Sequence, residues 1–414
     1  MKLEKYSFGL GDRFLHQGRA QLQAIVNARA AGIQITPVWN KSNREHKTVG
    51  TSPVSLREEA DAAVTALEYD GPYRLDADHI NLETVDPFVD SHDFFTIDVA
   101  DAIGRPADAD AVEAFVEQCS KCLGDLEIPG AGSFSVTPQT IREVANSFLG
   151  AVKLAGEIYR HIAGRRGDDN LIAEISMDET ETPQTPLEMF FILAAIAQEN
   201  IPVQTIAPKF TGRFNKGVDY VGDVAQFEKE FNDDLSAIAF AVAEFGLTEN
   251  LKLSVHSGSD KFSIYPAIKR ALKRTGAGLH VKTAGTTWLE ELIGLAEAGG
   301  EGLEIAKEVY ISALARSEEL CAPYATVIDV DADQLPTAEQ VKDWDSEKFS
   351  TSLRHDQAHP NYNPSFRQLL HVGYKVAAEM GDRYYNALEQ FETVVASNVT
   401  GNLWQRHLQP LFID

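Results

Sequence analysis

The sequence predicts an α/β fold, a (β/α)8 TIM-type barrel, on three observations. Short strand-like segments recur along the chain, amphipathic helix-like runs follow most of them, and about eight such units can be counted. Strands that alternate with helices pair in parallel through right-handed crossovers, and eight units is the number that closes a barrel. Because the spacing of the units is irregular, an open doubly wound sheet is the alternative.

The strand-like segments combine alternating or continuous apolar residues with β-branched and aromatic side chains. They are YSFGLGD (6–12), IQITPVW (33–39), YRLDADHI (73–80), DFFTIDV (93–99), NLIAEISMD (170–178), IPVQTIAPKF (201–210), LKLSVHSG (251–258) and GLHVKTAG (278–285). The helix-like runs that follow include GRAQLQAIVNARAAG, TPLEMFFILAAIAQEN, VAQFEKEFNDDLSAIAFAVAEFG and TTWLEELIGLAEAGGEG.

Two regions depart from this alternation. We expect a long helical insertion at about 105–165 and a C-terminal helical extension at about 335–414, which contains HVGYKVAAEMGDRYYNALEQFETVVASNV. The chain has no internal repeat, low-complexity tract or Pro/Ser-rich linker. Residues 1–414 are therefore predicted to form a single barrel domain that carries both additions.

The composition excludes several classes of protein. With 37 basic and 62 acidic side chains the formal charge is −25, whereas binding to nucleic acid or to an anionic membrane requires a basic face. No run of about 18 apolar residues is present to span a bilayer, and the segment MKLEKYSFGLGDRF lacks the apolar core of a signal peptide. We expect a cytoplasmic protein. The sequence is compatible with a homo-oligomer and does not fix the oligomeric state.

Cysteines and glycine-rich loops give no sign of a cofactor. The C-x-x-C pair Cys119 and Cys122 has no second pair or histidine cluster nearby to complete a zinc site, so these residues and Cys321 are interpreted as reduced thiols. The stretches GAGSFS (130–135) and GLGDRF (9–14) do not match G-x-G-x-x-G. We predict no nucleotide cofactor and, in particular, no nicotinamide.

Polar residues gather where the predicted strands end, which is where barrel enzymes place their chemistry. In strand order they are Asp76, Asp78 and His79; Asp98 and Asp101; Glu174, Asp178, Glu179 and Glu181; Lys209; His256, Asp260 and Lys261; and His280 and Lys282.

Three of the eleven histidines lie at these strand ends: His79, His256 and His280. One such histidine alone is more often a hydrogen-bonded interior residue, but imidazoles that converge from separate strands suit a catalytic zinc-type site with one open position. Asp78, beside one of the histidines, and Glu179 are the preferred acid/base candidates. Asp178 and Glu174 are substitutes for Glu179.

The lysines at the strand ends have two interpretations. Lys209, Lys261 and Lys282 are either ordinary charged loop residues or the cations that hold a carboxylate- or phosphate-bearing ligand. Lys209 or Lys282 is alternatively a Schiff-base lysine of an aldolase.

Six segments together resemble the tagaturonate epimerase family. They are DADHINLETVD, DFFTIDVAD, ISMDETETPQTPLE, TIAPKFTGRFNKGVDYVGD, LSVHSGSDKFSIYP and HVKTAGTTWLE, and the likeness runs from about residue 70 to 290 and more weakly through the remainder. The resemblance implies a metal-dependent barrel enzyme of hexuronate catabolism that interconverts D-tagaturonate and D-fructuronate. It implies His79, His256 and His280 as metal ligands and Asp78 and Glu179 as proton acceptor and donor.

Under this resemblance the anionic sugar lies against the loop that follows His256. Ser257 would let the backbone approach the sugar, and Asp260 with Lys261 would bind its hydroxyls or carboxylate. Three histidines favour zinc, although manganese, cobalt or nickel also suit such a site. The alternatives are a metal-dependent aldolase or ketose isomerase that acts on a sugar acid, and a non-catalytic sugar-acid binding barrel.

Overall fold

The computed structural model describes residues 1–413 except 179, 181, 258 and 284. Eight parallel strands close into a barrel in the order β1-β10-β9-β8-β7-β4-β3-β2. The strands are β1 (Tyr6–Gly11), β2 (Thr36–Ser42), β3 (Arg74–Ile80), β4 (Phe94–Asp98), β7 (Ile172–Ser176), β8 (Val203–Ala207), β9 (Lys252–His256) and β10 (Leu279–Thr283). Each overlaps a predicted segment, and the pairing of β1 with β10 confirms the barrel and rules out the open sheet.

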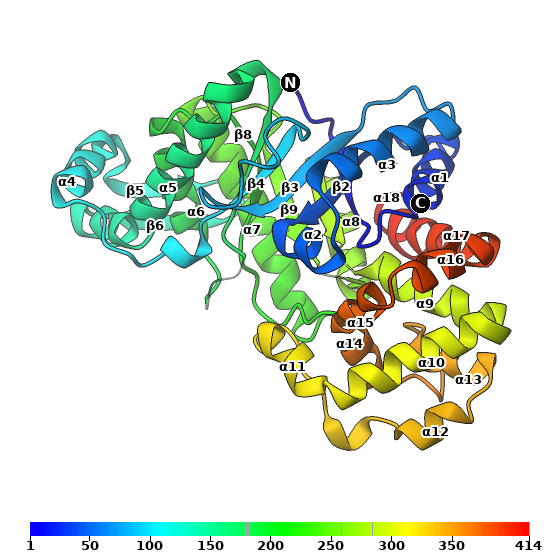
Figure 1. The fold of residues 1–414 in the computed structure, drawn as a ribbon. Helices are drawn as coiled ribbons and strands as arrows, with labels where there is room; N and C mark the ends of the chain where they lie inside the picture. The colour runs from blue at the N-terminus through cyan, green and yellow to red at the C-terminus, as the bar shows by residue number, and fades with distance from the viewer. Residues whose placement is uncertain (179, 181, 258, 284, 414) are drawn as a thin grey trace.

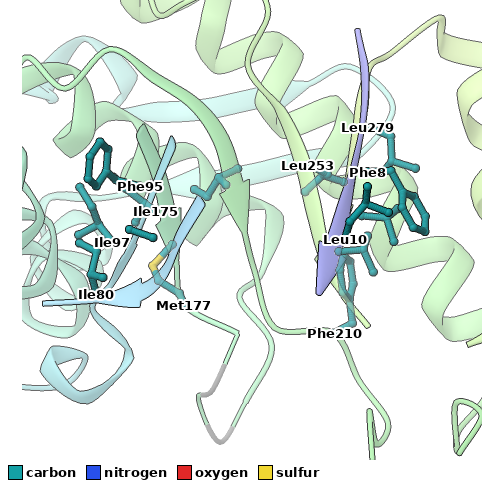
Figure 2. Packing of buried hydrophobic residues seen from close by; sticks show 14 of the residues in the cluster. Phe8, Leu10, Ile80, Phe95, Ile97, Ile175, Met177, Phe210, Leu253 and Leu279 are labelled. Carbon is teal, nitrogen blue, oxygen red and sulfur yellow. The ribbon is translucent and has the colours of Figure 1, made fainter. Parts of the chain in front are cut away.

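The strands alternate between a face toward the helices and a face toward the barrel axis. Figure 2 shows Phe95 and Ile97 of β4 gathered with Ile175 of β7 on one side of the sheet, where all three are fully buried. Toward the axis the alternate positions carry two layers. A small apolar cluster contains Val38, Phe94 and Ile172 with Leu3, and beyond it, toward the strand ends, lies a polar layer of Asp76, Thr96, Glu174 and Lys282.

Helices surround the barrel, and several of them begin at side-chain caps. The surrounding helices are α1 (Gly18–Ala30), α2 (Asn43–Val49), α3 (Pro53–Ala66), α6 (Pro186–Gln198), α7 (Val224–Phe245), α8 (Tyr265–Thr275) and α9 (Thr286–Ala298). Ser42 with Glu45 and Thr185 with Glu188 form capping boxes at α2 and α6. The connection from β3 to β4, residues 81–93, contains no helix.

The insertion between β4 and β7 contains both helices and strands, whereas the sequence predicted helices alone. It contains η1 (Ala100–Ala102), α4 (Ala109–Gln118), η2 (Ser120–Cys122), the antiparallel strands β5 (Gly124–Ile128) and β6 (Gly132–Val136), and α5 (Pro138–Arg166). This hairpin was not predicted, because its strands are short and mostly exposed and so lack a clear apolar pattern. Cys119 and Cys122 are free, and burial raises the pKa of Cys119 to about 12, as expected of an inert thiol.

Helices after the barrel cover one side of it (Figure 1). They are α10 (Gly300–Ala315), α11 (Ser317–Cys321), η5 (Ala322–Tyr324), η6 (Ala332–Gln334), α12 (Ala338–Lys342), α13 (Ser346–Leu353), α14 (Pro364–Val372), α15 (Tyr374–Glu379), α16 (Asp382–Gln390), α17 (Glu392–Gly401), the π-helix η7 (Asn402–Leu408) and α18 (Gln409–Phe412). They begin at residue 300, earlier than the predicted 335.

The helices beyond the barrel share its apolar core. α17 packs on both α1 and α9, and Gly294 of α9 allows the close approach, since a Cβ there would lie 2.6 Å from the Cα of Val395. One cluster of buried apolar side chains includes barrel residues such as Phe8 and C-terminal residues such as Leu403. That the chain forms one domain stays a prediction, and this shared core supports it.

Among the described residues, every helix is too short or too polar to cross a bilayer.

Candidate active site

A cavity of about 870 Å³ opens at the C-terminal ends of the strands, the face on which barrel enzymes hold their active sites. Strand ends supply Asp78, His79, Asp98, Asp178, His256 and Lys282. Helix α2 supplies Arg44 and Lys47, the segment after β8 supplies Lys209, Arg213 and Lys216, and η5 supplies Tyr324. The cavity is therefore acidic and histidine-rich next to the barrel and rich in cations farther out.

Two histidines and a carboxylate next to the barrel form a candidate metal centre. One donor atom from each of His79, Asp178 and His256 lies within 4.8 Å of the other two. The nearest approaches are 3.7 Å from His79 Nε2 to Asp178 Oδ1 and 3.2 Å from His256 Nδ1 to Asp178 Oδ2. Two imidazoles and one carboxylate are donors that zinc, manganese, cobalt and nickel accept.

The two histidines present the nitrogens that a metal would need. His79 Nδ1 lies 2.9 Å from Asp78 Oδ1, and His256 Nε2 lies 2.8 Å from Glu174 Oε1. The other ring nitrogens, His79 Nε2 and His256 Nδ1, are buried and have no hydrogen-bond partner in the described part of the chain. A carboxylate on the outer nitrogen fixes the ring orientation of a metal-binding histidine, so these residues fit a divalent cation.

A bulge at the end of β3 brings adjacent residues to the cavity. The pairing of β3 with β4 shifts register between Ala77 and Ile80, and His79 has a positive φ of 51°. In a regular strand the side chains of Asp78 and His79 would point to opposite faces. The bulge lets both line the cavity.

Lys282 holds the acidic residues beneath the metal centre. Its Nζ lies 2.6 Å from Asp76 Oδ2, 2.9 Å from Glu174 Oε1 and 3.1 Å from Asp78 Oδ1. Three carboxylates around one ammonium favour its charged form, whereas a Schiff-base lysine must lose its proton to attack a carbonyl. The arrangement therefore disfavours the aldolase-type imine that the sequence left open for this residue.

These contacts set the protonation of the cluster. Burial lowers the pKa of Lys282, but attraction to the carboxylates outweighs it and holds that pKa well above its usual range. Burial raises the pKa of Asp78, and His79 with Lys282 reverse the effect, so the pKa lies below the usual range. Asp76 differs, because burial dominates and raises its pKa to about 7.

His280 lies elsewhere, which corrects the expected three-histidine site. It is the second residue of β10, two positions or about 6.6 Å below Lys282 along the strand. Its Nδ1 lies 2.9 Å from Ser7 Oγ, and its ring packs on Phe94 at 5.3 Å between centroids. Burial lowers its pKa to about 3. Asp178, considered only as a substitute acid, lies where His280 was expected.

Three residues that were expected to bind the sugar lie outside the cavity, because the loop after β9 turns beneath the C-terminal helices. Ser257 Oγ donates to the carbonyl of Lys282 at 2.7 Å. Lys261 is fully buried and donates to the carbonyls of Asn215 and Val218 at 2.9 and 2.7 Å. Neither lines the cavity.

Asp260 is the third displaced residue. Its carboxylate is fully buried and contacts Arg367 at 2.7 Å, His407 at 3.0 Å and His355 at 3.1 Å. These partners all come from the C-terminal helices or the segment between them, so Asp260 joins the loop to that region. Of the other expected residues, Lys209 lines the cavity, and Glu179 lies outside the described residues.

Comparison with known proteins places the chain among sugar-acid epimerases. Residues 1–411 match the family model described as UxaE, tagaturonate epimerase. A tagaturonate/fructuronate epimerase of Thermotoga maritima is 29% identical over 420 residues, which cover 98% of this chain and 80% of the relative.

Solved structures agree with this assignment. A two-glycerol complex of the fructuronate-tagaturonate epimerase UxaE from Cohnella laeviribosi superposes with a TM-score of 0.80 at 26% identity, covering 99% of this chain and 82% of that one. The native structure of the same protein gives a TM-score of 0.79 at 26% identity over 98% of this chain and 81% of that one.

Proposed function

The chain belongs to the tagaturonate epimerase family and is an isomerase that acts on carbohydrates, and from this premise we propose that it interconverts D-tagaturonate and D-fructuronate. The observation that carries the proposal is the group His79, Asp178 and His256 at the mouth of the barrel, in a cavity large enough for a six-carbon sugar acid. A cytoplasmic location and the absence of a nicotinamide stay predictions of the sequence.

We propose that His79, Asp178 and His256 hold one divalent cation, with zinc favoured and manganese, cobalt or nickel as alternatives. The bound metal would supply Lewis-acid polarisation of the C2 ketone and its neighbouring hydroxyl. Glu174 and Asp78 orient the two imidazoles, and Lys282 holds both carboxylates in place.

The position of the epimerised carbon favours an aldol mechanism. The two sugars differ at C4, which is adjacent neither to the C2 ketone nor to the C6 carboxylate, so direct deprotonation there is difficult. The hydroxyl on C4 is β to the ketone, which is the arrangement of an aldol. Cleavage of C3–C4, rotation of the three-carbon aldehyde acid and re-formation of the bond on its other face invert C4 with no net oxidation.

Asp78 is the proposed base that takes the O4 proton during cleavage of C3–C4. It lines the cavity, contacts His79 directly and is held by Lys282. Glu179, which lies outside the described residues, is the proposed acid that returns a proton to O4 after the aldehyde has turned its other face. Lys209, which lines the cavity from the loop after β8, is the proposed contact for the sugar.

Product analysis by NMR tests this function. Purified enzyme should convert D-tagaturonate to D-fructuronate, lose the activity after chelation and regain it with zinc, manganese, cobalt or nickel. The aldol route predicts no solvent deuterium on C4 when the reaction runs in D2O, because the hydrogen stays on the aldehyde carbon. Accumulating three-carbon products would indicate an aldolase, a moved carbonyl would indicate a ketose isomerase, and absence of conversion with every metal would refute the proposal.

A further inference from the structure

The outer part of the cavity carries a concentration of positive charge, of which the proposed reaction uses only Lys209. Arg44, Lys47, Lys209, Arg213 and Lys216 line it, in a protein whose formal charge is −25. Next to the barrel the same cavity is lined by Asp78, Asp98 and Asp178. A ligand with one anionic end is therefore attracted to the outer loops and repelled from the acidic strand ends.

Lys216 and Lys209 have no acidic partner among the described residues, in contrast to Arg213. Arg213 is paired with Asp329 at 3.0 Å, whereas within the described ranges no carboxylate lies at ion-pair distance from Lys216 or Lys209. Both lysines are only half-buried, so their ammonium groups can be solvated in the free enzyme and can exchange water for an anion.

The position of Lys216 is fixed by the segment that follows the barrel. Its Nζ lies 5.8 Å from the centroid of the Tyr324 ring, and its backbone N–H donates to the carbonyl of Val327 at 2.8 Å. Arg44 approaches the same ring, with Cζ at 4.8 Å from its centroid. An aromatic face attracts a cation, so Tyr324 gathers one cation from the loop after β8 and one from α2 at the cavity wall.

We propose that Lys216, seated on Tyr324, binds the C6 carboxylate of the sugar acid and makes the enzyme selective for uronates over neutral ketoses. This inference rests on the proposed function. The C2 end of the sugar lies at the metal centre, so the carboxylate, at the far end of the chain, reaches the outer cations. In the aldol route the fragment that rotates is the one that bears this carboxylate, and Lys216 keeps it in the cavity during rotation.

The test compares Lys216→Met, Lys216→Arg and the wild type. Loss of one charge-assisted contact should raise the KM for D-tagaturonate about tenfold or more in Lys216→Met, whereas Lys216→Arg keeps the charge and should stay within about threefold of the wild type. Lys153→Met is the matched control, because Lys153 lies on α5 outside the cavity, with its side chain 44% exposed. Its KM should equal that of the wild type.

Calorimetry on the chelated, inactive enzyme separates this inference from the proposed function. The Kd of D-tagaturonate should rise in Lys216→Met by the same factor as the KM, and this readout does not depend on turnover. If the wild type does not convert the sugar, the proposed function fails. If Lys216→Met binds D-tagaturonate as the wild type does, or if Lys216→Arg is as impaired as Lys216→Met, the carboxylate contact is refuted.

Discussion

The two histidines at the barrel mouth, His79 and His256, each have one ring nitrogen that contacts an outer carboxylate and one that faces Asp178. In our proposal His79 and His256 are therefore ligands, whereas His280, which lies deeper in its strand and contacts Ser7, has a structural role. The distinction can be measured residue by residue.

We predict that His256→Ala loses bound metal and about 10²-fold or more of the activity, because it removes a ligand and not merely its support. His280→Ala is the matched comparison. This variant should keep one metal per chain but should have a lower free energy of unfolding. The substitution leaves the Ser7 hydroxyl without its partner and opens a cavity beside Phe94. Metal analysis after gel filtration, with chemical denaturation, checks both variants. If His280→Ala lost the metal and His256→Ala kept it, the assignment of His256 as the ligand and His280 as the structural residue would be reversed.

We propose that Glu174 acts on the metal through His256. Glu174→Gln keeps the shape of the side chain but removes the charge that orients the imidazole and balances Lys282. Loss of such an outer partner lowers metal affinity by about 10- to 100-fold. Competition with a chromogenic chelator measures the affinity, and an unchanged value would show that Glu174 serves only to pair Lys282.

The sequence identified the strand ends but not the depth of each side chain. His79 and His256 were correctly assigned to the mouth because they are the second-to-last residue of β3 and the last residue of β9, whereas His280 is only the second residue of β10. Asp260 and Lys261 were misplaced for another reason. Their surroundings are set by residues such as Arg367 and His407, more than 100 positions away, and local sequence does not show such partners.

At the scale of elements, the close packing of α9 against α17 depends on a small residue. A Cβ at Gly294 would lie 2.6 Å from the Cα of Val395, and the backbone of α17 cannot move freely. Gly294→Ala should therefore lower the free energy of unfolding by about 1–3 kcal/mol.

Gly164 of α5 provides the control for that prediction. A Cβ there meets no atom within 4 Å, so Gly164→Ala should stabilise the protein by about 0.5–1 kcal/mol through helix propensity alone. Urea denaturation of both variants gives the comparison. Equal effects of the two substitutions would contradict the proposed close approach of α9 and α17.

The eight barrel strands were predictable because buried parallel strands are continuous apolar runs bounded by polar residues. The hairpin of β5 and β6 was not, since it is largely exposed. The early start of the helical region was missed because α10 continues the amphipathic pattern of α9 after only a short break at Gly299.

For the whole molecule, the junction between barrel and C-terminal helices predicts how stability depends on pH. Glu290 of α9 is fully buried there, with Asn402 Nδ2 at 3.0 Å from Oε1 and Arg354 at 3.9 Å from Oε2. Burial raises its pKa from 4.5 to about 7, against the opposing attraction of Arg354 and Arg367.

Between pH 4.5 and 7 the folded protein therefore holds a proton that the unfolded chain has released, so this group makes stability fall as pH rises. Glu290→Gln removes that dependence. Relative to the variant, the wild type should lose about 3 kcal/mol of unfolding free energy across this interval, as measured by urea denaturation at several pH values. If the unfolding free energies of the wild type and Glu290→Gln changed with pH in the same way, the raised pKa of Glu290 would be contradicted.

The account as a whole depends on one metal ion per chain at His79, Asp178 and His256. The most direct test is to deplete the enzyme with a chelator and titrate zinc back while following the conversion of D-tagaturonate to D-fructuronate. We predict that activity rises linearly and saturates at one equivalent per chain, and that His256→Ala shows no such titration. Full activity in the depleted enzyme, or equal recovery in His256→Ala, would contradict the account.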